Sequence, residues 1–127
     1  MKLILDNRTE NLNKDMVFDE SDEKRSINVL HTLNGNTHTM LSLEREDEVR
    51  LDIGGGPDFF IVTCTKKNGQ GLTLLNPIKE SGNTIELCAG GQYADFPVEI
   101  VVDESVASDA IISFYKKNEQ SLDWEKE

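Results

Sequence analysis

Gly90-Gly91-Gln92-Tyr93-Ala94-Asp95-Phe96-Pro97 is the stretch around which the rest of this chain is organised. The paired glycines let the backbone turn sharply or approach another strand closely, because they lack the side chain that restricts other residues. Pro97 disfavours helical geometry in the residue before it, so Phe96 is expected to be extended. The apolar run over 98–102 then predicts a strand, and Asp103 predicts the start of a helix. We therefore expect a turn, a strand and a closing helix that pack together, and we expect the earlier strands to pack around them.

The closing helix is expected over about 103–117. Asp103 is a good N-cap, because its carboxylate can accept hydrogen bonds from the free N–H groups of the first turn. Asn118 is expected to end the helix in the left-handed conformation. Trp124 follows in the tail, which we expect to dock on the domain because an exposed tryptophan is unfavourable in water. One face of the helix is apolar and therefore expected to be buried; it carries Val106, Ala107, Ala110, Ile111 and Phe114.

Short apolar runs separated by turn signals predict a sheet before this unit. Residues 49–53 alternate strictly between apolar and polar, which is typical of a half-buried strand. Residues 59–65 are β-prone throughout, which predicts a central strand, and Asn68-Gly69 predicts a hairpin turn after it. A first helix is expected over about 22–33, with Ser21 as its N-cap. The other expected strands cover 1–5, 16–18, 39–43, 72–75 and 84–88.

Length and composition suit one domain with a core and a very polar surface. The chain has 127 residues, of which 37% are hydrophobic and 29% are charged. This length is enough for one domain and short for two. We expect an α+β fold over 1–127, in which a mostly antiparallel, meandering sheet carries two helices packed on one face.

The chain is strongly acidic. It has 13 basic and 24 acidic side chains and a net charge of -11, whereas a small domain usually carries roughly two to eight charges. Such a charge repels nucleic acid and anionic membranes and attracts basic surfaces. Solubility is the simpler explanation, and on charge alone it is favoured.

Nothing in the sequence predicts a membrane, metal or cofactor site. The apolar run before Asp6 is too short for an export signal, and no run is long enough to span a membrane. His31 and His38 have no partner at the spacing of metal ligands. Cys64 and Cys88 lie in strand-like runs, where we expect buried thiols in a reducing cytoplasm.

The sequence also predicts no catalytic residue. Gly54-Gly55-Gly56-Pro57 is followed by Asp58 and a strand, whereas a phosphate-binding loop continues with Gly-Lys-Ser/Thr and a helix. A turn between strands is therefore the favoured interpretation. Carboxylates are dense over 44–48, but in so acidic a chain they indicate a solvated turn rather than an acid-base pair. Neither cysteine has a histidine in a recognisable catalytic signature.

Tyr93 and Asp95 have two interpretations. Either Tyr93 fills the edge of the core while Asp95 caps a turn, or both residues serve a role at the surface. In an extended segment they point to the same side, and Ala94 and Phe96 point to the other side as the expected core-facing pair. An exposed tyrosine beside an acid suits a basic partner, because the acid can accept a hydrogen bond from lysine or arginine.

These motifs together resemble a known family. In order along the chain they are Gly54-Gly55-Gly56-Pro57-Asp58, Gly90-Gly91-Gln92-Tyr93, Asp95-Phe96-Pro97, a valine-rich run, Phe114-Tyr115 and Asp123-Trp124. The chain resembles the immunity-protein family first described beside deaminase-type toxins in bacterial polymorphic toxin and contact-dependent growth inhibition systems. The resemblance covers roughly the last two-thirds of the chain, and residues up to His38 show no matching motif. Family members often carry tryptophan at the position of Tyr93.

The resemblance implies a cytoplasmic protein without catalytic activity or cofactor, which binds the C-terminal toxin domain encoded beside it. Such toxins attack DNA or RNA and need a basic surface, to which an acidic protein is complementary. The expected partner is this toxin domain, with no direct contact to nucleic acid or membrane. The alternatives are a small acidic adaptor or nucleic-acid mimic without a dedicated toxin, and a small enzyme that uses a carboxylate pair. The expected toxin-binding residues are Glu44, Glu46, Asp47, Glu48, Asp58, Tyr93 and Asp95.

Overall fold

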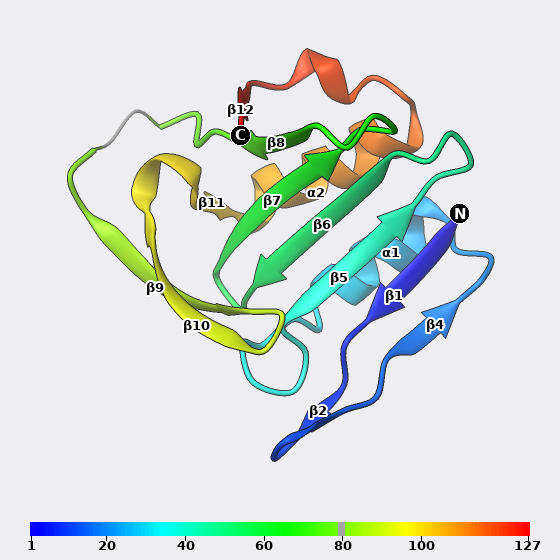
Figure 1. Ribbon diagram of the computed structural model, residues 1–127, viewed down its shortest axis with the longest axis horizontal. Coiled ribbons are helices and arrows are strands. Elements are labelled where there is room, and N and C mark those ends of the chain that lie inside the picture. The colour runs from blue at the N-terminus through cyan, green and yellow to red at the C-terminus, as the bar shows by residue number, and fades with distance from the viewer. Residues whose placement is uncertain (79–80) are drawn as a thin grey trace.

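The computed structural model describes residues 1–78 and 81–127, and the main feature of this part of the chain is an antiparallel sheet (Figure 1). Its strands lie in the order β12-β8-β7-β6-β5-β1-β4, with β11 paired to β7. The run from β5 to β8 is consecutive both in the chain and in the sheet, so the sheet meanders as predicted, and the α+β class is confirmed. The strands are β1 (Lys2–Leu5), β4 (Met16–Phe18), β5 (Met40–Glu44), β6 (Arg50–Gly55), β7 (Phe59–Thr65), β8 (Gly71–Leu74), β11 (Val102–Asp103) and β12 (Trp124–Lys126).

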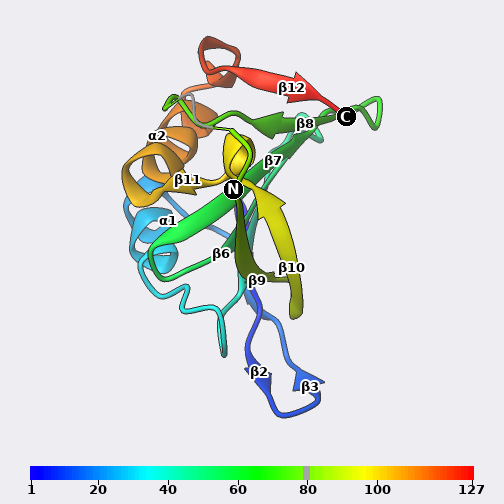
Figure 2. The ribbon, with the colours of Figure 1, turned by 90° about the vertical axis from the view of Figure 1, so that its left-hand side faces the viewer.

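Two helices cover one face of this sheet, as the sequence predicts. Figure 2 shows α1 (Glu23–Leu30) and α2 (Glu104–Tyr115) on one side, and the hairpin of β9 and β10 on the other. The alternation of side chains along each strand explains this arrangement. In β7, every second residue is buried and the residues between are half-buried or exposed. The sheet therefore has one face packed on the core and one face without a helix.

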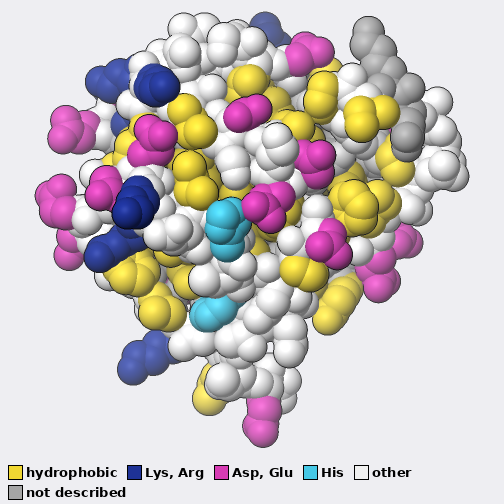
Figure 3. All heavy atoms as spheres, turned by 180° about the vertical axis from the view of Figure 1, so that it is seen from behind, with side chains coloured by type: hydrophobic (Ala, Val, Ile, Leu, Met, Phe, Trp, Pro, Cys, Tyr) yellow, Lys and Arg dark blue, Asp and Glu magenta, His cyan; other side chains and the backbone are white. Residues whose placement is uncertain are grey.

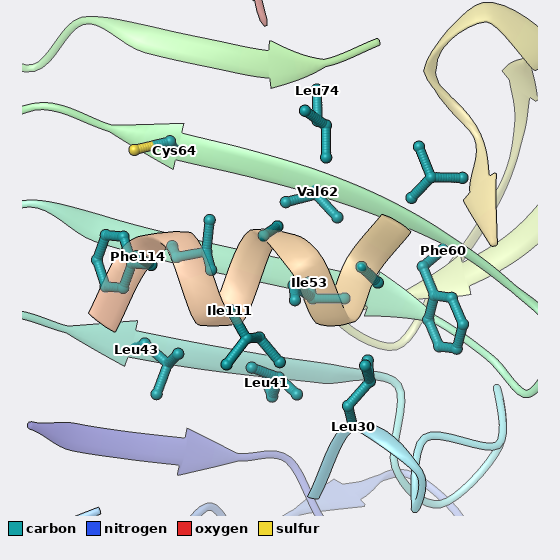
Figure 4. Close-up of a cluster of buried hydrophobic side chains, with 14 of the residues drawn as sticks. Leu30, Leu41, Leu43, Ile53, Phe60, Val62, Cys64, Leu74, Ile111 and Phe114 are labelled. Atoms are coloured by element: carbon teal, nitrogen blue, oxygen red, sulfur yellow. The ribbon is translucent and has the colours of Figure 1, made fainter. Parts of the chain in front are cut away.

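The core lies between α2 and the packed face of the sheet (Figure 4). Ile111 and Phe114 extend from α2 toward the sheet, and both are fully buried. This confirms the apolar stripe predicted for the closing helix. The strand side chains that complete the core include Leu41, Leu43, Leu51, Ile53, Phe60, Val62, Cys64 and Leu74.

The first helix is shorter than predicted and begins with a different cap. The sequence predicts a helix over 22–33 capped by Ser21, whereas α1 ends at Leu30 and its N-cap is Asp22. The Asp22 carboxylate accepts a hydrogen bond from the Arg25 backbone N–H at 2.8 Å, as an N-cap residue does. The buried Ser21 hydroxyl instead lies 3.3 Å from the Ser26 hydroxyl, inside the helix.

The second helix has the predicted start and a different end. Asp103 accepts a hydrogen bond from the Val106 N–H at 3.0 Å, so the predicted N-cap is confirmed. The left-handed residue after the helix is Lys117, with a φ of 57°, and not Asn118 as predicted. The tail then docks on the sheet, as predicted: the Trp124 indole N–H donates to the Glu119 carbonyl at 2.8 Å, and β12 pairs with β8.

The apolar run over 98–102 is not the strand that the sequence predicts. Instead, β10 starts directly after Gly90-Gly91 and pairs with β9 over six residues. The two glycines have φ values of 63° and 80°, which permit a two-residue hairpin turn. The apolar run then carries the chain back to β7, and most of it is a 3-10 turn. The elements are β9 (Thr84–Ala89), β10 (Gln92–Pro97) and the 3-10 turn η1 (Val98–Ile100).

A second, smaller hairpin projects from the lower edge of the molecule in Figure 1. It consists of β2 (Arg8–Thr9) and β3 (Leu12–Asn13), which pair with each other and not with the main sheet. We call residues 8–13 the arm.

Candidate protein-binding surface

The hairpin of β9 and β10 lies on the helix-free face of the sheet because Gly54 of β6 lets it approach closely. A Cβ atom at position 54 would lie 2.5 Å from the Cβ of Ala89 in β9, which is too close for any side chain. At position 55, a Cβ would lie 2.7 Å from the Phe59 carbonyl oxygen. The predicted turn is therefore shorter than the glycine run: Gly54 and Gly55 belong to β6, and Gly56 begins the connection to β7. Gly54 also makes room for the hairpin.

One face of the hairpin presents Tyr93, Asp95 and Glu86, and we call it the hairpin face. Tyr93 is 68% exposed, so of its two interpretations the structure shows the position at the surface and not the one at the edge of the core. Asp95 is also exposed, and the register places it directly opposite Glu86 of β9. Ala94 is exposed too, so it is not the core-facing residue that alternation predicts, whereas Phe96 is half-buried.

The pair of Glu86 and Asp95 is unfavourable for the isolated fold. Directly opposed residues in an antiparallel pair have Cβ atoms about 4.5–5.5 Å apart, where like charges repel. Neither carboxylate has an ion-pair partner among the described residues. A basic side chain from another molecule would relieve this repulsion.

A buried cluster around Asp6 fixes the turn of the hairpin to the sheet. The Asp6 carboxylate accepts hydrogen bonds from the Arg8 guanidinium at 2.7 Å, from the Thr39 N–H at 2.6 Å and from the Thr39 hydroxyl. Because this hydroxyl donates to Asp6, its oxygen is free to accept the Gly91 N–H, at 2.9 Å. We call Asp6, Arg8, Thr39 and Gly91 the Asp6 cluster.

The electrostatics of the Asp6 cluster favour an ionised carboxylate. Burial would raise the pKa of Asp6, but the hydrogen bonds from Thr39, Arg8 and the Met40 N–H outweigh burial and lower that pKa below its usual value. Asp6 is therefore a structural anion that joins the end of β1, the start of β5 and the hairpin turn.

The acidic turn over 44–48 lies at the other end of the sheet. Glu44 pairs with Arg50 at the far end of β5, whereas Met40 pairs with Gly54 at the end near the hairpin. The four residue steps between these pairs correspond to about 13 Å. Asp58 lies in the turn after β6, at the hairpin end, and is exposed. The structure therefore divides the predicted site: Tyr93, Asp95 and Asp58 share one end, and Glu44, Glu46, Asp47 and Glu48 lie at the opposite end.

Most acids of the distant turn already have partners within the fold. The Arg45 guanidinium binds Asp47 at 2.9 Å and Glu119 at 2.8 Å. The hydrogen bonds from Arg45 lower the pKa of Asp47. Glu48 lies 3.1 Å from the Lys67 ammonium, and Glu44 lies 4.0 Å from the Arg50 guanidinium. Glu46 alone among the four has no ion-pair partner in the described part of the chain.

A groove of about 1160 Å³ lies beside the C-terminal tail. Its buried or half-buried lining is mostly apolar and includes Leu72, Leu122 and Trp124, with Glu119 as a charged exception. Its exposed rim carries lysines. The thiol of Cys64 also lines it, but burial raises the pKa of this thiol to about 11, so it is protonated at neutral pH. The groove therefore holds no activated cysteine nucleophile. No cluster of three or more possible metal ligands occurs in the described residues.

Two features of the candidate surface were not assigned to it from the sequence. Glu86 becomes part of the hairpin face only through the strand register, and no local signal in the sequence marks it. The apolar edge strand β4 carries Met16 and Val17, which are 40% and 51% exposed. Its signal in the sequence was three consecutive apolar residues, Met16-Val17-Phe18, between charged ones.

The sequence matches no model of a known protein family and no curated protein. In the residues that the structure describes, neither helix has the length and apolar character needed to cross a membrane.

Proposed function

We propose that this chain is a cytoplasmic immunity protein, which binds a nucleic-acid-targeting toxin domain and neutralises it by covering its basic surface. The observation that carries the proposal is the hairpin face, where an exposed tyrosine adjoins two opposed and uncompensated carboxylates. The resemblance of the sequence motifs to the immunity-protein family supports the same function.

The chemistry of the hairpin face suits lysine or arginine on a partner. A carboxylate forms short, charge-assisted hydrogen bonds with either side chain, and these are roughly twice as strong as neutral ones. Tyr93 offers a large ring that loses little conformational freedom on binding. Tyrosine is also enriched among the residues that contribute most to binding at protein interfaces.

The charge of the whole chain supports the same kind of partner. At -11 the protein attracts a basic domain over a longer range than any single contact, which speeds the encounter. A toxin that acts on DNA or RNA must hold phosphates with basic side chains. The protein and the nucleic acid therefore compete for the same surface of the toxin.

The proposal is tested by co-expressing the affinity-tagged chain with the toxic C-terminal domain encoded immediately upstream. We expect the two proteins to co-purify as a stoichiometric complex, and the chain to protect cells that express the toxin. The control is an unrelated basic domain of similar size and net charge, which the chain should not retain at physiological salt.

Two outcomes contradict the proposal. If the upstream-encoded domain neither binds nor is neutralised, the chain is not its immunity protein. If the chain captures the unrelated basic domain equally well, it is a general acidic adaptor rather than a dedicated inhibitor.

A further inference from the structure

Strand β4 forms an open edge of the main sheet. It pairs with β1 on one side, with Ile4 opposite Val17 and Leu5 opposite Met16, and the sheet order ends there (Figure 1). The outer side of an edge strand presents backbone N–H and C=O groups that can pair with another strand. Among the described residues, no backbone hydrogen bond occupies this side of residues 16–18.

The two edges of the sheet differ in the protection they carry. At the opposite edge, β12 exposes Glu125 and Lys126, and charges of this kind normally prevent edges from pairing. Strand β4 instead exposes apolar side chains, since Met16 is 40% and Val17 is 51% accessible. Such an edge is suited to accept a strand from a partner.

The arm connects this edge to the hairpin face. A Cβ atom at Gly91 would lie 2.4 Å from the Arg8 guanidinium carbon, so the hairpin turn and the start of the arm are in contact. At the tip of the arm, Leu12 is 75% exposed. Figure 3 shows the arm projecting from the lower edge of the molecule. The hairpin turn, the arm and β4 therefore follow one another along the same end of the sheet.

The charges around β4 indicate what occupies the edge. In the sequence three acids and one lysine flank the apolar strand, and in the fold the Arg25 guanidinium lies 5.1 Å from the centre of the Phe18 ring, which leaves an excess of one acid: Asp15, Asp19 and Glu20 against Lys14 and Arg25. This combination attracts an extended segment with basic and apolar side chains. We propose that such a segment of the toxin domain pairs with β4 and extends the sheet by one strand. This inference rests on the proposed function and specifies a second contact of the same complex.

A second copy of the chain fits the edge less well. Two antiparallel copies paired at Val17 would place Asp15 of each copy opposite Asp19 of the other, and like charges in direct opposition are unfavourable. Each copy also carries a net charge of -11. A basic partner avoids both sources of repulsion.

The inference is tested by hydrogen exchange of the free protein and of its complex with the upstream-encoded toxin domain, followed by mass spectrometry. We expect amide exchange in residues 16–18 to slow by at least about tenfold in the complex, because new interstrand hydrogen bonds protect the outward N–H groups. Val17→Arg should weaken binding by at least about tenfold by repelling the basic segment, without loss of folded protein.

The matched control is Ile78→Arg. Ile78 is 62% exposed and lies outside β4, the arm and the hairpin, so the same substitution should change affinity by no more than about twofold. Both variants are checked by thermal melting before the binding measurement.

The outcomes separate this inference from the proposed function. A complex in which exchange of residues 16–18 is unchanged overturns the strand addition and leaves the immunity function intact. A toxin domain that does not bind at all overturns both. A free protein that is dimeric, and becomes monomeric on Val17→Arg, shows that β4 binds a second copy and overturns this inference.

Discussion

Arg45 shows how a single residue joins distant parts of the chain. Its guanidinium binds Asp47 and Glu119, donates to the Phe114 carbonyl at 2.8 Å and lies 4.4 Å from the centre of the Phe114 ring. The hydrogen bonds to Glu119 raise the pKa of Arg45 further, so it stays charged at every accessible pH. The densest acidic turn of the sequence is therefore anchored to α2 and serves the fold.

Phe114→Ala should destabilise the protein strongly. The ring is fully buried between α2 and the sheet, so its loss leaves a cavity and is expected to lower the free energy of unfolding by roughly 3 to 5 kcal/mol. Urea unfolding, followed by the fluorescence of Trp124, measures the change. Phe59→Ala is the control, since Phe59 is 46% exposed and should have a much smaller effect. Equal effects of the two substitutions would show that the assignment of the core is wrong.

The sequence predicted the burial of Phe114 but not the partners of Arg45. The burial follows from the helical spacing of Val106, Ala110 and Phe114, which is a local pattern. Arg45 and its acceptor Glu119 are 74 residues apart, and only the folded sheet and helix bring them together. For the same reason the acids over 44–48 looked like free surface charge.

At the scale of elements, the Asp6 cluster determines where the hairpin lies. It joins three segments through one buried carboxylate and one threonine hydroxyl. The hairpin otherwise touches the sheet mainly where Gly54 and Gly55 permit close approach. Weakening the cluster should therefore loosen the hairpin before it unfolds the core.

Asp6→Asn should lower stability and its dependence on pH. Hydrogen bonds to an ionised group contribute about 1.5 to 3 kcal/mol, and part of this is lost at pH 7. The pKa of Asp6 is lower in the folded protein than its usual 3.8, so its ionisation stabilises the fold above that value. This contribution disappears as the pH falls through the folded-state pKa.

Urea unfolding at pH 7 and pH 3 measures this effect. The variant should lose less stability than the wild type between these two pH values, although Asp47 and Glu119, whose pKa values are also lowered, keep some dependence. Asp58→Asn is the control, because Asp58 is an exposed turn residue. An unchanged pH dependence in Asp6→Asn would contradict the role of the cluster.

Most elements were predictable from local patterns, and the strand predicted over 98–102 failed for a physical reason. Residues 98–102 have high β-propensity, but this measures how well side chains fit a half-buried sheet and not which strand is paired. The glycine turn closes so tightly that the residues directly after it pair with β9. The valine run is left to connect the hairpin to β7, and the strand prediction fails there.

At the scale of the whole molecule, charge and surface act together. The net charge of -11 attracts a basic partner from any direction, and the hairpin end combines exposed acids that have no ion-pair partner among the described residues with the exposed ring of Tyr93. The site was predictable in part: Tyr93 and Asp95 follow from sequence position, whereas Glu86 and the separation of the acidic turn follow from the register of the strands.

Glu86→Lys should slow association with the proposed toxin domain while leaving the fold intact or more stable. A lysine opposite Asp95 replaces repulsion by attraction, which is worth roughly 0.2 to 1 kcal/mol in an antiparallel pair. The same change removes an acid that attracts the basic partner. Stopped-flow association at low and high salt, with a thermal melt, measures both effects.

Glu46→Lys is the control of equal charge change at the opposite end of the sheet. It should slow association less than Glu86→Lys at the same salt concentration, since both variants have the same net charge. If the two variants slow association equally, long-range charge alone steers the partner and the hairpin face has no special role.

The hairpin face is tested most directly by a binding titration of the double variant Tyr93→Ala, Asp95→Ala against the proposed toxin domain, with a thermal melt of the same sample. Both side chains are exposed, so the melting temperature should change by less than about 4 °C. Binding should weaken by more than about thirtyfold, which corresponds to the threshold of about 2 kcal/mol for a dominant interface residue. A double variant that melts like the wild type and binds with unchanged affinity would contradict the claim that the hairpin face binds the toxin.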